Sequence, residues 1–164
     1  MKTKNNIFVA VSLFFITVGF ALSLGSIASF IAMNIIATKP LLPDDFVVWQ
    51  RHFITPIMNY ASIPGIVLFL CGNGLFLFQK TIRKTDVTLF LLSAVVFVNG
   101  MFFIVPTAHK ANVFADNQIY LAQHWDTFLE QKTIEDSLGG ANLLLLLSYL
   151  FVFIYLIIKD KLKI

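Results

Sequence analysis

Asparagine and histidine are the side chains of this 164-residue chain whose positions suggest chemistry. Asn59, Asn99 and Asn142 lie in three different apolar stretches, and Asn34 adds an amide near the end of another. An amide that faces lipid is costly, so we expect these side chains to point inward. The pattern predicts either a hydrogen-bond network that fixes helix packing or a polar, outward-facing pocket in which Asn59, Asn99 and Asn142 bind a ligand.

The three histidines belong to segments that we assign to the outer side of a membrane. His52 precedes the second apolar stretch, and His109 and His124 follow the third. An imidazole can accept or donate a proton near neutral pH, so His109 and His52 are the candidate catalytic residues. His124, Asn112 and Trp125 are candidate ligand-binding residues at the mouth of the pocket.

Metal and thiol chemistry are less favoured by the residue spacing. Three imidazoles on one side could hold zinc or copper, but none shows the spacing of a paired ligand set, so we predict no metal. A bis-histidine haem usually needs histidines within the spans, which are not found here. Cys71 is the only cysteine, which rules out paired-thiol disulfide chemistry within the chain. The sequence therefore names no cofactor.

Four apolar stretches must position these side chains. The chain is 58% hydrophobic and 13% charged, with a mean hydropathy of +0.83, which is too apolar for a soluble domain. A span needs about 20 apolar residues. We expect spans at about 7–37, 55–78, 87–105 and 139–158. Residues 1–164 are therefore predicted to form a single all-α domain, an integral membrane four-helix bundle.

Local residue types predict where these helices begin, bend and end. Thr55, followed by proline, is typical of a helix start, and so is Thr133, followed by acidic residues. Pro64 predicts a kink within the second span, and Pro106 predicts the end of the third. In the first span, a stripe of small residues at every fourth position predicts the face that packs on another helix: Thr17, Ala21, Gly25 and Ser29.

Positive charge is concentrated in three short segments that flank the spans. These segments carry eight basic residues against Asp86 and Asp160, a net charge of +6, whereas the remaining loops carry a net charge of −3. The eight residues are Lys2, Lys4, Lys80, Arg83, Lys84, Lys159, Lys161 and Lys163. Basic loops stay in the cytoplasm. The pattern predicts cytoplasmic N and C termini, with the chain in a bacterial inner membrane. Membrane lipid, not nucleic acid, is the expected partner.

The two outer loops are predicted to hold short amphipathic helices. Asp44 or Asp45 could cap one whose apolar side carries Phe46, Val47, Trp49 and Phe53. Asp116 could cap another that ends near Gln131. Such helices would lie flat on the membrane or cover the mouth of the bundle.

One segment resembles a known family. Asn99 to Asn112 reads NGMFFIVPTAHKAN, which is similar to the end of the third helix in small membrane proteins of the anthrone oxygenase-like family. The four spans, the long third loop and the position of Trp125 are similar too. The arginine that the family often has at the start of the fourth helix is absent here. The resemblance implies a four-helix bundle and an oxidoreductase or oxygenase that acts on an activated aromatic without a metal or flavin.

Two functions from different classes remain open. In the first, the chain binds a small hydrophobic or aromatic molecule in an outward-facing polar pocket, as a binding protein or an oxidoreductase. In the second, it is a non-catalytic structural or assembly subunit whose helices bind other membrane helices. The sequence leaves open the ligand, the presence of enzymatic activity, and the choice between a homo-oligomer and association with other membrane subunits.

Overall fold

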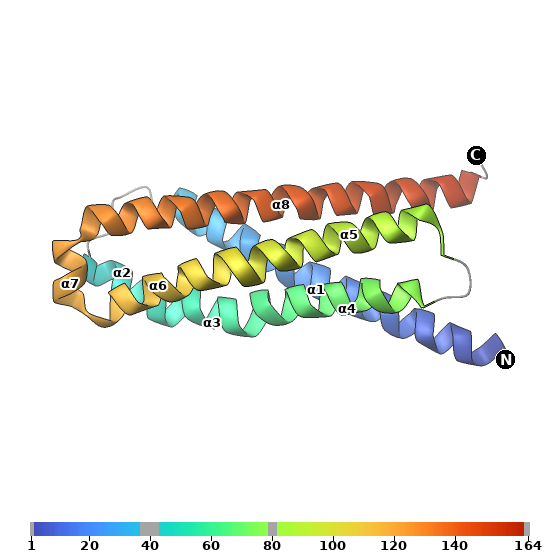
Figure 1. Ribbon diagram of the computed structural model, residues 1–164, viewed down its shortest axis with the longest axis horizontal. Coiled ribbons are helices and arrows are strands. Elements are labelled where there is room, and N and C mark those ends of the chain that lie inside the picture. Colours follow the sequence, from blue (N-terminus) through green and yellow to red (C-terminus); the bar gives the residue numbers. More distant parts are fainter. Residues whose placement is uncertain (1, 37–42, 79–81, 163–164) are drawn as a thin grey trace.

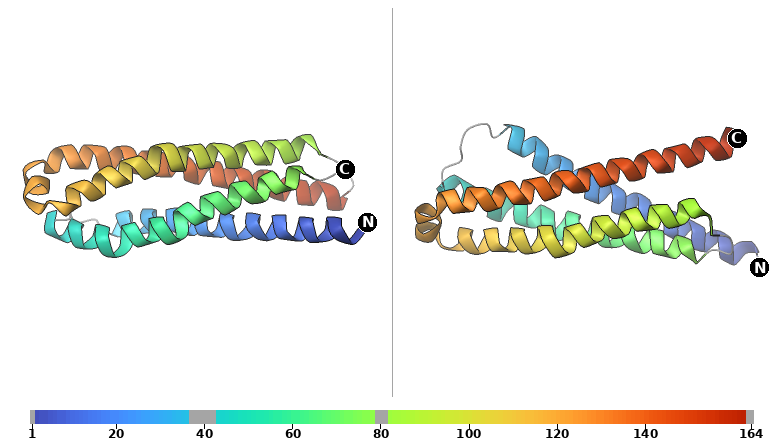
Figure 2. Two further views of the ribbon diagram at one scale, coloured as in Figure 1. Left: turned by 60° about the horizontal axis from the view of Figure 1, so that its bottom comes forward. Right: turned by 45° about the horizontal axis from the view of Figure 1, so that its top comes forward.

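The computed structural model describes residues 2–36, 43–78 and 82–162, and within them it is 96% helical and contains no strand. Four helical rods are long and apolar enough to cross a membrane. They run side by side along the long axis of the molecule (Figure 1). The start of α1, the end of α4, the start of α5 and the end of α8 lie at one end, here called the terminal end, and α7 lies at the other, the α7 end (Figures 1 and 2). The expected four-helix architecture is confirmed.

The rods contain more elements than four simple helices. Rod 1 is α1 (Lys2–Ile36), and rod 4 is α8 (Trp125–Leu162). Between rods 3 and 4 stands the short α7 (Gln118–Gln123). Rod 2 joins α2 (Pro43–Trp49), the π-helical turn η1 (Gln50–Ile54), α3 (Thr55–Ile57), the π-helical turn η2 (Met58–Ser62) and α4 (Ile63–Leu77). Rod 3 joins α5 (Lys84–Asn99), the π-helical turn η3 (Gly100–Ile104) and α6 (Val105–Asp116).

Each π-helical turn ends two residues before a proline. The prolines are Pro56, Pro64 and Pro106, after η1, η2 and η3 respectively. Proline lacks an N–H, and its ring clashes with the carbonyl four residues earlier in an α-helix. A turn with one extra residue relieves this conflict without ending the helix. Pro106 therefore does not end the helix, because rod 3 continues to Asp116. The end of the third span in the membrane stays a prediction.

Two predicted helix starts are also wrong. Thr55 lies inside rod 2, and its hydroxyl donates to Asn112 Oδ1 at 3.1 Å instead of capping a helix. Thr133 lies inside α8, where its hydroxyl donates to the Leu129 carbonyl at 2.9 Å. At an assumed rise of about 1.5 Å per residue, the 38 residues of α8 extend well beyond a hydrocarbon core of about 30 Å. Both threonines precede features typical of a helix start, but the chain had become helical earlier.

The predicted second loop helix is shorter than expected. Asn117, not Asp116, caps α7, because its side chain accepts from the backbone N–H of Tyr120 at 3.1 Å. The helix ends at Gln123, so the expectation that it continues to about Gln131 is wrong. A compact apolar cluster from α2, α6, α7 and α8 closes this end: Phe46, Val47, Ala111, Leu121 and Phe128.

Rods 1 and 2 pack in close contact through glycine. A Cβ added at Gly72 would lie 2.6 Å from the backbone nitrogen of Ile16, and one at Gly65 would lie 2.8 Å from the Cβ of Leu22. Small residues permit this approach between membrane helices. The buried small residues of α1 are Ser12, Gly19, Ser23 and Ser26. The predicted packing stripe is wrong within this chain, since Thr17, Ala21 and Gly25 are exposed and Ser29 is only half-buried.

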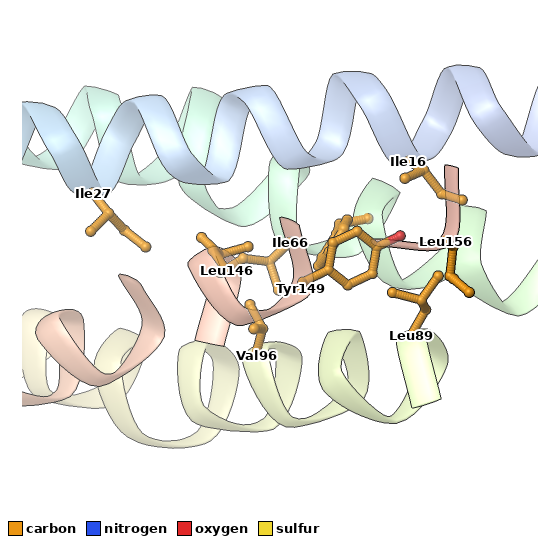
Figure 3. Close-up of a cluster of buried hydrophobic side chains, with 9 residues drawn as sticks. Ile16, Ile27, Ile66, Leu89, Val96, Leu146, Tyr149 and Leu156 are labelled. Carbon is orange, nitrogen blue, oxygen red and sulfur yellow. The ribbon is translucent and has the colours of Figure 1, made fainter. Parts of the chain in front are cut away.

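The apolar core follows the middle of the bundle and its terminal half. Figure 3 shows its buried side chains, drawn from all four rods: Ile16, Ile27, Ile66, Phe69, Leu89, Val96, Leu146, Tyr149 and Leu156. In that view Ile27 stands apart from Ile66 and Leu146. Ile27 and Ile66 both line the cavity described next.

Candidate ligand site

A cavity of about 100 Å³ lies in the half of the bundle nearer α7. All four rods line it, and most of its wall is apolar, with Ile27 from α1, Ile66 from α4 and Ile104 from η3. Its size is of the order of the ~150 Å³ engineered apolar cavity that binds benzene. The space therefore suits a molecule built around one small ring.

All three π-helical turns contribute to the wall. Ile54 comes from η1, Met58 and Ser62 from η2, and Gly100 and Ile104 from η3. A π-helical turn places side chains out of step with the α-helix around it and often occurs at functional sites. The three prolines thus shape the cavity through the turns that precede them.

An amide pair fixes one wall. Asn142 is fully buried and lines the cavity, and its Oδ1 accepts from Asn99 Nδ2 at 2.9 Å. The same Asn99 nitrogen donates to the Leu138 carbonyl at 3.1 Å, and Asn142 Nδ2 lies 3.5 Å from the Val96 carbonyl. These contacts tie rod 3 to rod 4. The two amides meet each other, as one of the two sequence interpretations expects, and one of them also faces the cavity.

Two hydroxyl groups in the wall lack hydrogen-bond partners within the described part of the chain. They are the Oγ atoms of Ser23, a residue that is 1% exposed, and of Ser62. Other serines of α1 form hydrogen bonds within their own helix; for example, Ser26 Oγ donates to the Ser23 carbonyl at 3.0 Å. A buried hydroxyl without a partner costs free energy. Both residues line the cavity, and each Oγ is itself buried within the wall.

Charged side chains from the half of α8 nearer α7 line the cavity. Lys132 Nζ lies 2.7 Å from Asp136 Oδ1 and 3.6 Å from Glu135 Oε2. The side chains of Lys132 and Glu135 are only 16% and 13% exposed, whereas that of Asp136 is 44% exposed. On a helix, Glu135, Gly139 and Asn142 share one face. This face of α8 runs from the charged cluster to the buried amide.

The other predicted ligand-binding amides lie elsewhere. Asn59 is exposed and does not line the cavity. Asn112 accepts from Gln50 Nε2 at 2.7 Å and from the Thr55 hydroxyl, which joins rods 2 and 3 at the α7 end. The side chain of Asn34 is outside the described residues. Of the predicted amides, the structure brings together Asn99 and Asn142.

The histidines also lie away from the cavity lining. His52 and His109 are exposed, and neither lines the cavity. His124 stacks on Tyr120 at a centroid distance of 4.0 Å, and its Nδ1 lies 2.9 Å from the Tyr120 carbonyl. Trp125 stacks on Phe128 in the apolar cluster that closes the α7 end. A catalytic role for His52 and His109 stays a prediction.

Among the described residues, no group of three or more histidine, cysteine, aspartate and glutamate side chains is placed to hold a metal ion.

Comparison with protein-family models, with curated proteins and with solved structures finds no match. The resemblance to anthrone oxygenase-like proteins therefore stays a prediction.

Sequence reasoning missed most of the cavity's polar residues. Ser23 and Ser62 are inconspicuous because a serine in a membrane helix usually bonds its own backbone. Lys132 was predicted to lie in a loop, and Glu135 in the first turn of the fourth helix. A signal did exist, since Glu135, Gly139 and Asn142 recur at helical spacing. They would have indicated one shared face if the fourth helix had been predicted to begin earlier in the sequence.

Proposed function

We propose that this protein is an integral membrane protein that binds a small amphipathic molecule in the cavity between its four rods. The ligand has an apolar part about the size of one ring and a polar end. The observation that carries the proposal is a cavity of about 100 Å³ lined by Ser23 and Ser62, two residues whose buried hydroxyls have no hydrogen-bond partner among the described residues. A core selected only for packing would fill this space and pair these hydroxyls.

The orientation of the chain is part of the proposal. The starts of α1 and α5 and the end of α8, which belong to the three basic segments, lie at the terminal end, so the positive-inside rule favours cytoplasmic termini. The cavity then lies in the outer half of the membrane, and the charged turn of α8 lies near the outer interface. Ligands would enter from the outer side, with α2 and α7 folded over the mouth of the bundle.

Orientation can be tested by thiol labelling in a Cys71→Ser background. Gln118→Cys is on α7, where the residue is exposed, and Lys84→Cys is exposed at the terminal end. We expect an impermeant maleimide to label Gln118→Cys in intact cells and Lys84→Cys only after the membrane is opened. The reverse pattern would overturn the orientation.

Binding can be tested with benzyl alcohol, a ring with one hydroxyl. We expect weak binding, with a Kd of about 1 mM, since the ligand is small. At ten times the Kd, the ligand should stabilise the purified protein against unfolding by about 1.4 kcal/mol. Heteronuclear NMR or titration calorimetry in the same detergent measures the Kd directly.

A cavity-filling variant separates binding in the cavity from partition into detergent. Gly139 lines the cavity, and a Cβ added there meets no atom within 4 Å. Gly139→Leu should therefore fold normally and abolish binding. Gly25→Leu is the matched control, because Gly25 is exposed on α1 and a Cβ there also meets nothing within 4 Å. Equal binding to both variants would show that the alcohol does not occupy the cavity, and the proposal would fail.

A further inference from the structure

The charges that line the cavity do not cancel. Among its described lining residues, the charged ones are Lys132, Glu135 and Asp136, with a formal net charge of −1. One ammonium is shared unequally between two carboxylates, since it lies 2.7 Å from Asp136 and 3.6 Å from Glu135. The longer distance exceeds that of a hydrogen bond. The Glu135 carboxylate is thus largely buried and incompletely paired.

An anionic ligand would meet a poor environment here. Lys132 is the one cation among the described lining residues, and Asp136 already holds its Nζ. An anion would have to displace that carboxylate and then lie near Glu135. A cation meets the opposite situation, because Glu135 has accepting capacity left and a buried carboxylate is stabilised by a charged donor.

The partnerless hydroxyls add a second, independent indication. Ser23 and Ser62 both line the cavity, and the buried Oγ of each has no hydrogen-bond partner among the described residues. A hydroxyl can accept a hydrogen bond, and an ammonium has three N–H donors and no acceptor. Carboxylate and hydroxyl oxygens are therefore the kind of lining that an ammonium requires.

We infer that the cavity prefers ligands whose polar end is a primary amine and whose body is a small apolar group. The inference rests on the proposed function and narrows it to one class of ligand. Glu135 is the residue that selects the charge, and Ser23 and Ser62 accept the remaining donors.

Three ligands of matched size test the charge preference: benzylamine, benzyl alcohol and benzoate. At pH 7 we expect benzylamine to bind about tenfold more tightly than benzyl alcohol, as one charge-assisted hydrogen bond allows, and benzoate to bind most weakly. Equal binding of the three, or tightest binding of benzoate, would overturn the inference while leaving a binding cavity. Failure of all three to bind would overturn the proposed function itself.

Two variants assign the preference to the cavity. Glu135→Gln should remove the tenfold advantage of benzylamine and leave the affinity for benzyl alcohol unchanged. Glu130→Gln is the matched control, because it removes the same charge from an exposed position of α8 that does not line the cavity. Loss of the advantage in Glu130→Gln, or its persistence in Glu135→Gln, would contradict the role of Glu135.

Lys132→Gln gives a test of opposite sign. It removes the cation that competes with a ligand ammonium for the two carboxylates, so benzylamine should bind several-fold more tightly than to the unaltered protein. Weaker binding of benzylamine would overturn the inference. Circular dichroism of each variant confirms that it remains helical.

The amine could come from a lipid headgroup or from a free molecule. Vesicles of phosphatidylcholine alone and vesicles that also contain phosphatidylethanolamine distinguish the two sources. Competition of the ethanolamine lipid with benzylamine supports a headgroup amine, and undiminished benzylamine binding supports a free one. Competition by phosphatidylcholine instead would contradict the preference for a primary amine.

Discussion

The close approach of α1 and α4 allows a sharp test of the packing that presents Ser23 to the cavity. A Cβ added at Gly19 would lie 2.7 Å from both the Gly65 carbonyl oxygen and the Phe69 Cα. These are backbone atoms, so neither can turn aside. Ordinary van der Waals contact begins near 3.4 Å. The backbone nitrogen of Phe69 would lie closer still, so Gly19→Ala should push the two helices apart by more than about 0.7 Å, the difference between these distances.

The expected free-energy change follows from two opposing effects. Overpacking of this kind costs about 1–3 kcal/mol. Alanine also favours a helix over glycine by about 1 kcal/mol, which partly offsets that cost. Gly25→Ala gains the same helix propensity on the same helix but meets no atom within 4 Å. The difference between the two variants isolates the packing cost, so Gly19→Ala should be less stable than Gly25→Ala by about 1–3 kcal/mol.

The measurement is reversible unfolding in mixed micelles, followed by circular dichroism as the denaturing detergent is increased. Benzyl alcohol binding provides a second readout, because displacement of α1 carries Ser23 away from the cavity. Equal stability of the two alanine variants would refute the close contact. It would also remove the reason why glycine occupies position 19.

Two smaller predictions concern buried hydrogen bonds. Tyr149→Phe removes the 2.8 Å hydrogen bond that Tyr149 Oη donates to Asn73 Oδ1, and it should lower the free energy of unfolding by about 1 kcal/mol. The control is Tyr155→Phe, at an exposed position of α8, which should cause no measurable change. Equal losses in the two variants would contradict this. Single and double alanine variants of Asn99 and Asn142 should show a coupling energy of about 0.6 kcal/mol, which is typical of interhelical hydrogen bonds in membranes. If the free-energy changes of the two single variants simply add up in the double variant, the bond contributes nothing.

The sequence predicted the rods because the membrane imposes them. A segment that crosses lipid must be helical and apolar over about 20 residues, which leaves little freedom in where the four rods can lie. The pairing of Asn99 with Asn142 was predictable for the same reason, since a buried amide needs a partner. The partner was not predictable for Asn112, which bonds Gln50, a residue with no signal of its own.

Helix boundaries were mispredicted where local rules competed with packing. Thr55, Pro106 and Thr133 are each of a type that starts or ends helices, yet each lies within a rod. The π-helical turns allow rods 2 and 3 to continue through their prolines, and α8 begins early because Phe128 is buried against Phe46 of α2. Such contacts join segments that are distant in sequence, so a local pattern could not reveal them.

The features that local rules missed are also those that form the cavity. The extra residue in η2 and η3 turns Ser62, Gly100 and Ile104 toward the bundle interior, where they line the cavity. Because α8 starts early, Glu135 lies on the same helix face as Asn142, and the carboxylate and the buried amide both line the cavity. A rod 4 that began at Thr133 would place Glu135 in its first, fraying turn. The irregular helices are therefore a requirement of the cavity, and straightening them should remove the cavity before it unfolds the bundle.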